Sequence, residues 1–349
     1  MYDAILLVSF GGPEKSEDVI PFLENVTRGR NIPRERLLEV AGHYHHFGGR
    51  SPINDQCREL IAALRQELNA HEINLPIYWG NRNWLPLLPD TLREMRDAGV
   101  KNALALVTSA YSSYSGCRQY RENIAAAQEA AGRGAPRIDK LRVFYNHPDF
   151  IAACVDRVRE AAAQFAASEA PSLRMVATAH SIPCAMAQTS DYEKQLRETA
   201  RLVAEGAGLE TWDLVYQSRS GPAAQPWLEP DILDHLRLLH DQGVTNVIVA
   251  PLGFVSDHLE VLYDLDYEAQ RLANDLGMKM VRAGTAGTHP LFIKMLRQLI
   301  AERLFPDRPK LAMGLYGPNH DVCPADCCPA PPRAGRPPAS EAQAVSRLS

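Results

Sequence analysis

The sequence predicts an α/β protein built from two similar, doubly wound (Rossmann-like) halves, each with a parallel sheet. Two observations lead to this fold class. Short apolar runs alternate with amphipathic helical patterns, which is the order of βαβ units. The chain also repeats itself, since DAGVKN at 97–102 and DQGVTN at 241–246 each lead into an apolar run. We expect residues 1–145 and 146–322 to form the two halves, with the active site in the cleft between them.

The individual elements follow from periodicity and punctuation. The first strand is predicted at 4–8, and the boundary between the halves near 142–147. Prolines at 89 and 230 each precede an Asp that opens a helix, and a glycine follows each of these helices. Helices are predicted at 55–68, 92–98, 149–165, 192–205 and 231–241, with a closing amphipathic helix at 286–305.

Composition excludes several classes of protein. The 349 residues carry a net charge of −5, with 37 basic and 42 acidic side chains, so no global basic excess indicates nucleic-acid binding. No apolar run approaches the roughly 18–20 residues of a membrane-spanning helix. No basic segment precedes the first strand, so we expect no signal peptide. The expectation is a cytoplasmic protein, most simply a monomer.

The segment 251–268 (PLGFVSDHLEVLYDLDYE) holds the most informative pattern. It follows an apolar run, and Glu260, Asp264 and Glu268 are spaced four residues apart. On a helix this spacing stacks three carboxylates along one face, where like charges repel. Such a row of oxygens can bind a divalent cation and pass it along. The alternative is a solvated acidic face with Asp257 as a helix cap.

A second strand-like run ends at His180, which is followed by Ser181 and then Pro183. Ligands of α/β proteins bind at the carboxyl ends of parallel strands, and a histidine there can act as a base near neutral pH. The alternative is a structural histidine. In the repeat, Phe10 of the first half occupies the place that His180 occupies in the second half.

Cysteines crowd near the C-terminus at Cys323, Cys327 and Cys328. Without a secretion signal, such a cluster predicts a metal site more readily than a disulfide framework. Residues 323–349 form a tail rich in Pro and Ala, of which the last twenty or so have the composition of a disordered segment.

With these residues in hand, the chain resembles the ferrochelatases, which insert Fe²⁺ into a porphyrin. The likeness covers nearly all of residues 4–305. It rests on GGP at 11–13, GG-x-SP at 48–52, AHS-x-P at 179–183, PWL-x-PD at 226–231 and GF-x-SDHLE-x-LYD-x-DYE at 253–268.

The resemblance implies roles for the residues already singled out. His180 would be the active-site base and Glu260 the carboxylate opposite it. Together with Asp264 and Glu268 they would form the metal path. A neutral histidine and a carboxylate on opposite sides of a ring-sized cleft can take pyrrole protons and strip water from Fe²⁺.

The short N-terminus and the TRGR segment at 27–30 are more similar to the bacterial branch of the family that uses coproporphyrin III. That porphyrin carries four propionates where protoporphyrin IX carries two, and Arg28, Arg30, Arg50 and Ser51 are candidate contacts for them. Two further candidate pocket residues are Phe10 and Tyr111. Some relatives have a tyrosine in place of Phe10 that can ligate iron, which Phe10 cannot do. Tyr111 can equally be an ordinary aromatic wall.

Some ferrochelatases hold a [2Fe-2S] cluster with one mid-chain cysteine and three near the C-terminus. By that resemblance Cys154 would be the mid-chain ligand, alongside Cys323, Cys327 and Cys328. A zinc site or an unliganded tail are the alternatives. The implied partners are the porphyrin and either an iron donor or a downstream enzyme of haem biosynthesis. The competing functions are insertion of cobalt or nickel into a related tetrapyrrole, insertion of iron into protoporphyrin IX, and non-catalytic tetrapyrrole binding.

Overall fold

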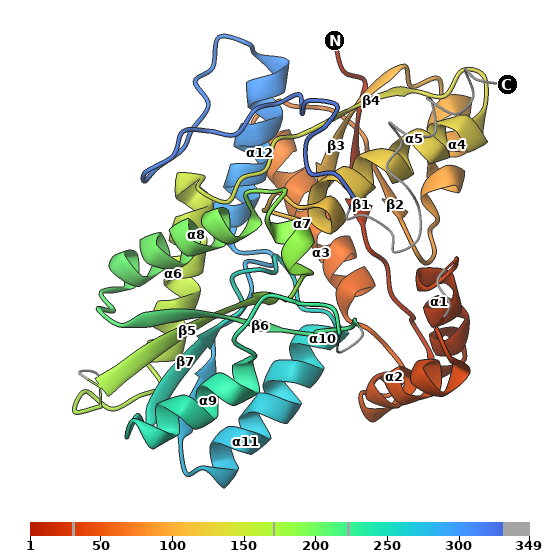
Figure 1. Ribbon diagram of the computed structural model, residues 1–349. Helices are drawn as coiled ribbons and strands as arrows, with labels where there is room; N and C mark the ends of the chain where they lie inside the picture. The colour runs from red at the N-terminus through yellow and green to blue at the C-terminus, as the bar shows by residue number, and fades with distance from the viewer. Residues whose placement is uncertain (30–31, 170–171, 222–223, 331–349) are drawn as a thin grey trace, which may run out of the picture.

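The computed structural model describes residues 1–29, 32–169, 172–221 and 224–330. Two four-stranded parallel sheets lie within these residues, with helices packed around them (Figure 1). The first sheet has the order β2-β1-β3-β4 and the second the order β6-β5-β7-β8. The expected fold class is confirmed. Its strands are β1 (Ala4–Ser9), β2 (Ile77–Asn81), β3 (Asn102–Val107), β4 (Arg137–Lys140), β5 (Leu173–His180), β6 (Trp212–Gln217), β7 (Asn246–Ala250) and β8 (Lys279–Arg282).

The two sheets have the same connectivity, as the sequence repeat predicts. In each sheet the first strand of the half lies between the second and the third strands, and every pairing is parallel. The chain direction of the crossovers therefore reverses next to β1 in one sheet and next to β5 in the other. In open parallel sheets such a switch point opens a crevice at the carboxyl ends of the strands. Phe10 follows β1, and His180 ends β5.

The helices agree with the predicted ones to within a few residues. The predicted helix at 231–241 begins at Ile232, because the side chain of Asp231 caps it by accepting a hydrogen bond from the Leu233 amide at 2.9 Å. The larger helices are α1 (Val19–Val26), α2 (Arg34–His46), α3 (Ile53–Ala70), α4 (Leu88–Asp97), α5 (Gln119–Ala131), α6 (Pro148–Ala162), α8 (Tyr192–Ala207), α9 (Ile232–Asp241) and α12 (Pro290–Leu304).

Short helical pieces occupy the strand ends and junctions. These are η1 (Ser16–Asp18), η2 (Tyr114–Arg118), α7 (Cys184–Ala187), α10 (Leu259–Val261), η4 (Leu262–Ala269) and α11 (Gln270–Asp275). Both η2 and η4 are π-helical. The sequence predicts an ordinary helix for the carboxylate segment, and the π-helical turns are a finding of the structure.

One hydrophobic core extends through both halves. It contains Ile5 and Leu64 of the first half together with Phe150 and Leu299 of the second, all nearly inaccessible to solvent. The closing helix α12 packs on both α3 and α6. A separate small core joins α1 to α2 around Phe22 and Ala41. The α1–α2 unit is therefore attached to the molecule differently from the rest of the first half.

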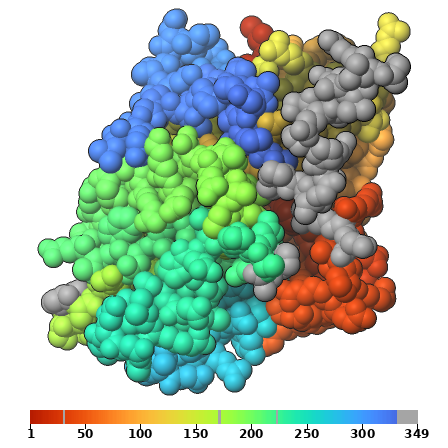
Figure 2. Space-filling model, viewed as in Figure 1, coloured from red at the N-terminus to blue at the C-terminus, as the bar shows by residue number. Residues whose placement is uncertain are grey.

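The segment after α12 contacts both halves. The amide of Leu315 donates a hydrogen bond to Glu198 of α8 at 2.6 Å, and Asn319 reaches Ser112 beyond β3 at 3.4 Å. Figure 2 shows this segment in blue, lying on the surface beside the green residues of the second half. None of the described helices has the length and apolar character that crossing a bilayer requires.

Candidate active site and cysteine cluster

His180 presents a free ring nitrogen at the end of β5. Its Nδ1 is hydrogen-bonded to the carbonyl oxygen of Ser181, which can only accept, so in the neutral ring Nδ1 carries the proton. The Nε2 lone pair is left exposed and lies 3.6 Å from Oε2 of Glu260. The hydroxyl of Tyr192 donates to the His180 carbonyl at 3.0 Å and fixes the backbone. The geometry gives a base whose orientation and tautomer are both set.

Glu260 is brought to His180 by a close approach of two strand ends. The amide of Gly253 donates to Thr178 of β5 at 2.9 Å. A Cβ on Gly253 would lie 2.6 Å from Ala179, so a larger residue would push the β7–α10 loop away from β5. His258 approaches Glu260 from a second side, with Nδ1 3.9 Å from Oε2, and burial lowers the pKa of His258.

The three carboxylates of the predicted row do lie along one path. Asp264 accepts hydrogen bonds from the hydroxyl of Ser218 and from Gln217 Nε2, the latter at 3.3 Å. Burial, together with the charges of Glu260 and Glu268, raises the pKa of Asp264 to about 7. Burial and the charge of Asp231 raise the pKa of Glu268. The path is therefore continuous from Glu260 towards Asp231.

Pairing separates these carboxylates from the other acidic residues of the segment. Asp257 and Asp266 are both held by Arg282, with Asp257 Oδ1 3.1 Å from the guanidinium. Among the described residues, no Lys or Arg pairs with Glu260, Asp264 or Glu268. An unneutralised row of oxygens, part of it half-buried, is costly for the fold and is suited to a cation.

The turn of η4 explains how the row is spread. A π-helix closes its hydrogen bonds one residue later than an α-helix, so its turns are wider, and such turns occur frequently at functional sites. The same widening presents Tyr263 and Tyr267 on another face. There His43 stacks on Tyr263, with ring centroids 3.7 Å apart, and His46 lies 4.3 Å from Tyr267. These contacts hold α2 of the first half against the helix that carries the carboxylates.

A cavity of about 480 Å³ opens beside the site. Ser181 at the end of β5 and Asp231 at the start of α9 both line it, together with Arg219, Glu229 and Asp234. It therefore lies at the Asp231 end of the carboxylate path.

The described residues that were predicted in the first half lie in different surroundings. Phe10 packs edge-on against Phe22 at 6.2 Å, and the guanidinium of Arg82 lies 5.7 Å from its centroid. Arg28 is exposed, just after α1. Arg30 lies outside the described residues.

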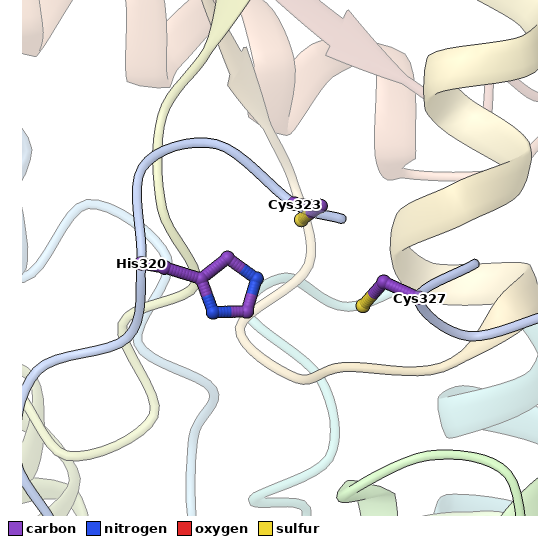
Figure 3. A group of neighbouring side chains, drawn as sticks. All are labelled: His320, Cys323 and Cys327. Carbon is purple, nitrogen blue, oxygen red and sulfur yellow. The ribbon is translucent and has the colours of Figure 1, made fainter. Parts of the chain in front are cut away.

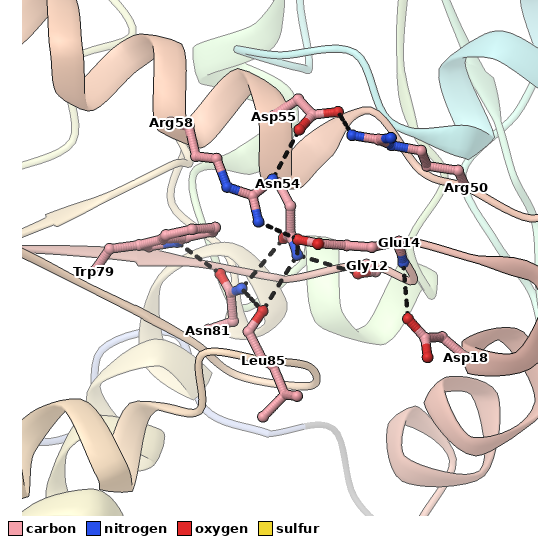
Figure 4. A network of polar contacts seen from close by, with 10 residues as sticks. All are labelled: Gly12, Glu14, Asp18, Arg50, Asn54, Asp55, Arg58, Trp79, Asn81 and Leu85. Carbon is pink, nitrogen blue, oxygen red and sulfur yellow. Dashed lines mark hydrogen bonds and ion pairs between the residues drawn. The ribbon is translucent and has the colours of Figure 1, made fainter.

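Arg50 belongs to a polar network beside the glycine turn after β1 (Figure 4). Arg50 pairs with Asp55, which also binds Arg58 at 2.7 Å. Ser51 is buried, and its amide donates to Pro13 at 2.9 Å. A Cβ on Gly12 would lie 2.8 Å from the Cβ of Ser51. The close packing of the GGP turn at 11–13 against the GG-x-SP segment at 48–52 therefore requires glycine at position 12.

Tyr111 lies in the interior of the molecule, at the ends of two strands. The ring is 2% exposed, and the hydroxyl donates to the Leu252 carbonyl at 2.6 Å. With its hydroxyl engaged, Tyr111 joins the end of β3 to the end of β7, and its role is that of the aromatic wall.

The C-terminal cysteines do come together, but with a different mid-chain partner. Cys327 and Cys328 have their sulfurs 3.4 Å apart. A hydrogen bond joins the thiols of Cys117 and Cys323, and it lowers the pKa of Cys117, as do Lys140 and Arg121. Side chains of His320, Cys323 and Cys327 point towards one another, with their ligand atoms within 4.8 Å (Figure 3).

Cys154, the mid-chain cysteine implied by the resemblance, lies in different surroundings from Cys117. Cys154 lies on α6 inside the shared core, where burial raises the pKa of its thiol to about 12. No described interaction links it to the C-terminal cysteines. Sequence reasoning missed Cys117 because its place depends on how the last segment folds back across α5, which no local pattern encodes.

Comparison with known proteins decides the family. The ferrochelatase family model matches residues 2–304. The chain belongs to the ferrochelatase family. It is therefore an enzyme of the lyase class, as its similarity to ferrochelatases implies.

Curated relatives cover almost the whole chain. It is 57% identical over 345 residues to "Ferrochelatase" of Rhodopirellula baltica, covering 99% of this chain and 97% of the relative. It is 50% identical over 363 residues to "Coproporphyrin III ferrochelatase" of Streptomyces griseus, covering 98% and 96%.

A solved structure has the same fold at low sequence identity. SirB from Bacillus subtilis with Fe³⁺ has a TM-score of 0.53 and 15% identity, covering 87% of this chain and 98% of SirB. At this identity the likeness concerns the fold alone.

Proposed function

We propose that this ferrochelatase inserts Fe²⁺ into coproporphyrin III, forming Fe-coproporphyrin for haem biosynthesis in the cytoplasm. The observation that carries the proposal is that a candidate base lies next to the first carboxylate of the acidic row. A histidine with a free Nε2 lies 3.6 Å from Glu260, and Glu260 begins a row of carboxylates without cationic partners. The histidine serves the removal of protons and the row of carboxylates the supply of metal.

The proposed reaction divides between these groups. Two pyrrole N–H protons must leave as the porphyrin nitrogens bind the metal, so the ring loses two protons and gains one Fe²⁺. The Nε2 lone pair of His180 accepts a proton while Nδ1 keeps its own, held by Ser181. Glu260 stabilises the imidazolium that results, and its exposed carboxylate passes this first proton to solvent, so that His180 can accept the second. Asp264 and Glu268 exchange carboxylate oxygens for the water ligands of the incoming Fe²⁺.

The choice of coproporphyrin III rests on two kinds of support. A relative that is 50% identical over nearly the whole chain is named a coproporphyrin III ferrochelatase. Arg28 is exposed, and Arg50 is exposed in an ion pair with Asp55, which a propionate can replace. Ser51 positions this loop. Protoporphyrin IX is the alternative substrate.

Initial rates with both porphyrins test the proposal. Under anaerobic conditions with Fe²⁺, coproporphyrin III should give the faster collapse of the porphyrin Q bands. Combined replacement of Arg28 and Arg50 by Ala should weaken the binding of coproporphyrin III more than the binding of protoporphyrin IX. Coproporphyrin III has two more propionates than protoporphyrin IX that can lose their arginine partners. Replacement of Arg237, exposed on α9, is the matched control. If the unmodified enzyme prefers protoporphyrin IX, the assignment of coproporphyrin III as substrate is wrong. If neither porphyrin is metallated, the proposed enzymatic function is wrong and simple tetrapyrrole binding is favoured.

We propose in addition that the cysteines near the C-terminus hold a [2Fe-2S] cluster. The fit of the residues is favourable, because several thiols of the described chain converge on one place and cationic groups surround them. When bound, the cluster supplies cross-linking of this segment, and no step of iron insertion passes through it. About two iron and two sulfide per chain beyond the substrate metal would support it.

A further inference from the structure

Cys117 lies where the C-terminal thiols gather, although it is more than two hundred residues away in sequence. It belongs to η2 and is 3% exposed, and its thiol lies beside that of Cys323. Cys323 and Cys327 have sulfurs within 4.8 Å, and Cys327 is 3.4 Å from Cys328. The four sulfurs therefore form a continuous chain that begins on the first half of the molecule.

Two arginines just after Cys117 also hold the backbone of the loop that carries the other three cysteines. Arg118 donates to the Cys327 carbonyl at 3.2 Å. Arg121 donates to the carbonyls of Cys323 and Pro324 at 3.2 and 3.4 Å. Two consecutive turns of one helix thus hold the loop that carries the three cysteines. The same arginines bring positive charge to a place where thiolates would collect.

The adjacent cysteines face the same way because of the backbone at Cys328. Its φ of +51° lies in the left-handed region, which is rare for a residue with a side chain. Two thiolates on one tetrahedral metal with bonds of about 2.3 Å lie about 3.8 Å apart. The 3.4 Å between Cys327 and Cys328 is close to that separation.

We propose that Cys117, and not Cys154, is the fourth protein ligand of the cluster, with Cys323, Cys327 and Cys328 supplying the other three. This inference rests on the [2Fe-2S] cluster proposed above. A chain of four sulfurs suits two metals, each holding a pair, better than one tetrahedral ion that needs all four within about 4 Å. His320 stands beside the cluster and is not a ligand. The cluster then joins the C-terminal segment to the first half, between β3 and α5.

The test compares two serine variants of the full chain. Cys117→Ser should lose the visible absorbance and at least half of the iron and sulfide, while Cys154→Ser keeps both. His320→Ala should also keep both. Cys117→His is a second test for the ligand role, because a histidine ligand to iron shifts the absorption bands and raises the reduction potential. This variant also decides the question if Cys117→Ser does not fold.

Several outcomes overturn the assignment. Normal iron and sulfide in Cys117→Ser, an unchanged spectrum in Cys117→His, or bleaching of Cys154→Ser each contradict Cys117 as the fourth ligand. Zinc without sulfide in the unmodified protein contradicts the [2Fe-2S] cluster itself. The ligand assignment is then decided separately by zinc content, which Cys117→Ser should lower and Cys154→Ser should not.

Discussion

At the scale of single residues, His180 should be indispensable. Replacement by Ala removes the proton acceptor, and a positioned general base contributes on the order of 10²–10⁴-fold to a rate. We expect iron insertion to fall at least about 100-fold. The side chain is partly exposed, so the thermal midpoint should stay within a few degrees of that of the unmodified enzyme. Iron insertion at a normal rate by His180→Ala would contradict its role.

The carboxylates should act in a graded way. Glu260→Gln should reduce kcat most, because Glu260 alone of the three faces His180. Glu268→Gln should mainly raise the apparent KM for Fe²⁺, because it lies further along the path. Steady-state rates over a range of Fe²⁺ concentrations separate the two effects. Unchanged iron dependence in both variants would identify the row as a solvated face.

Asp264 should make iron binding depend on pH near neutrality. Its pKa is raised from 3.8 to about 7, so the carboxyl group is neutral below that pH and charged above it. The apparent KM for Fe²⁺ should fall between pH 6 and pH 8, and Asp264→Asn should flatten this dependence.

Protonation of Asp264 should affect the stability of the fold in the opposite way, so that stability falls as pH rises while Fe²⁺ binding improves. Between pH 3.8 and about 7 the folded state binds a proton that the unfolded state has released, so this group destabilises the fold as pH rises. Asp264→Asn should therefore raise the thermal midpoint more at pH 8 than at pH 5. An equal change at both pH values would show that Asp264 titrates normally.

The residues that the sequence could supply are those with a local pattern. His180 is found from an apolar run that ends in a histidine, and Glu260, Asp264 and Glu268 from their spacing. Ser218 is different, because it reaches Asp264 from another strand end, with a φ of +61° that only the folded chain reveals. Cys154 was named only through the family resemblance, because sequence alone does not say which mid-chain cysteine the last segment meets.

At the scale of elements, the closing helix α12 carries a buried ion pair that should matter for stability. Arg142 and Glu302 are almost inaccessible and pair through two hydrogen bonds of 2.8 and 2.9 Å. Glu302→Gln leaves the Arg142 charge without its partner, and breaking such a pair costs about 3–5 kcal/mol. Urea unfolding should measure a loss of this order.

An exposed ion pair supplies the matched control. Glu193 and Arg197 on α8 are 2.7 Å apart in solvent, and Glu193→Gln should cost less than about 1 kcal/mol. Equal losses in the two variants would mean that burial of the Arg142–Glu302 pair has no special consequence.

The elements were largely predictable, because the spacing of apolar residues and the Pro, Asp and Gly residues at the element ends determine them. The helix predicted at 192–205 is observed as Tyr192–Ala207, and the strand predicted at 4–8 as Ala4–Ser9. The π-helical form of η4 was not predictable, because the same residues would also fit an α-helix.

At the scale of the whole molecule, the segment after α12 should be divisible into a needed and a dispensable part. A chain ending at 330 should keep its activity and thermal midpoint, because residues 331–349 are rich in Pro and Ala and offer little to bury. A chain ending at 305 should be less stable, because it loses the bonds of Leu311 and Leu315 to the buried pair and to α8. Thermal unfolding of the two truncated chains measures the difference, and equal midpoints would contradict it.

The repeat itself was predictable from the match between two six-residue segments, but the way the halves join was not. The shared core and the return of the last segment arise from contacts between residues distant in sequence. These contacts join the two halves more extensively on one side of the molecule than on the other. On one side α12 and the segment that follows it bind both halves, while on the other side α2 meets η4 mainly through the stacking of His43 on Tyr263.

This difference has a consequence for access to the site. The α1–α2 unit has its own small core, whereas α12 packs in the core that both halves share. Separating α2 from η4 would break ring contacts and leave the shared core intact, so a flat macrocycle would enter at the lowest cost to the fold between α2 and η4.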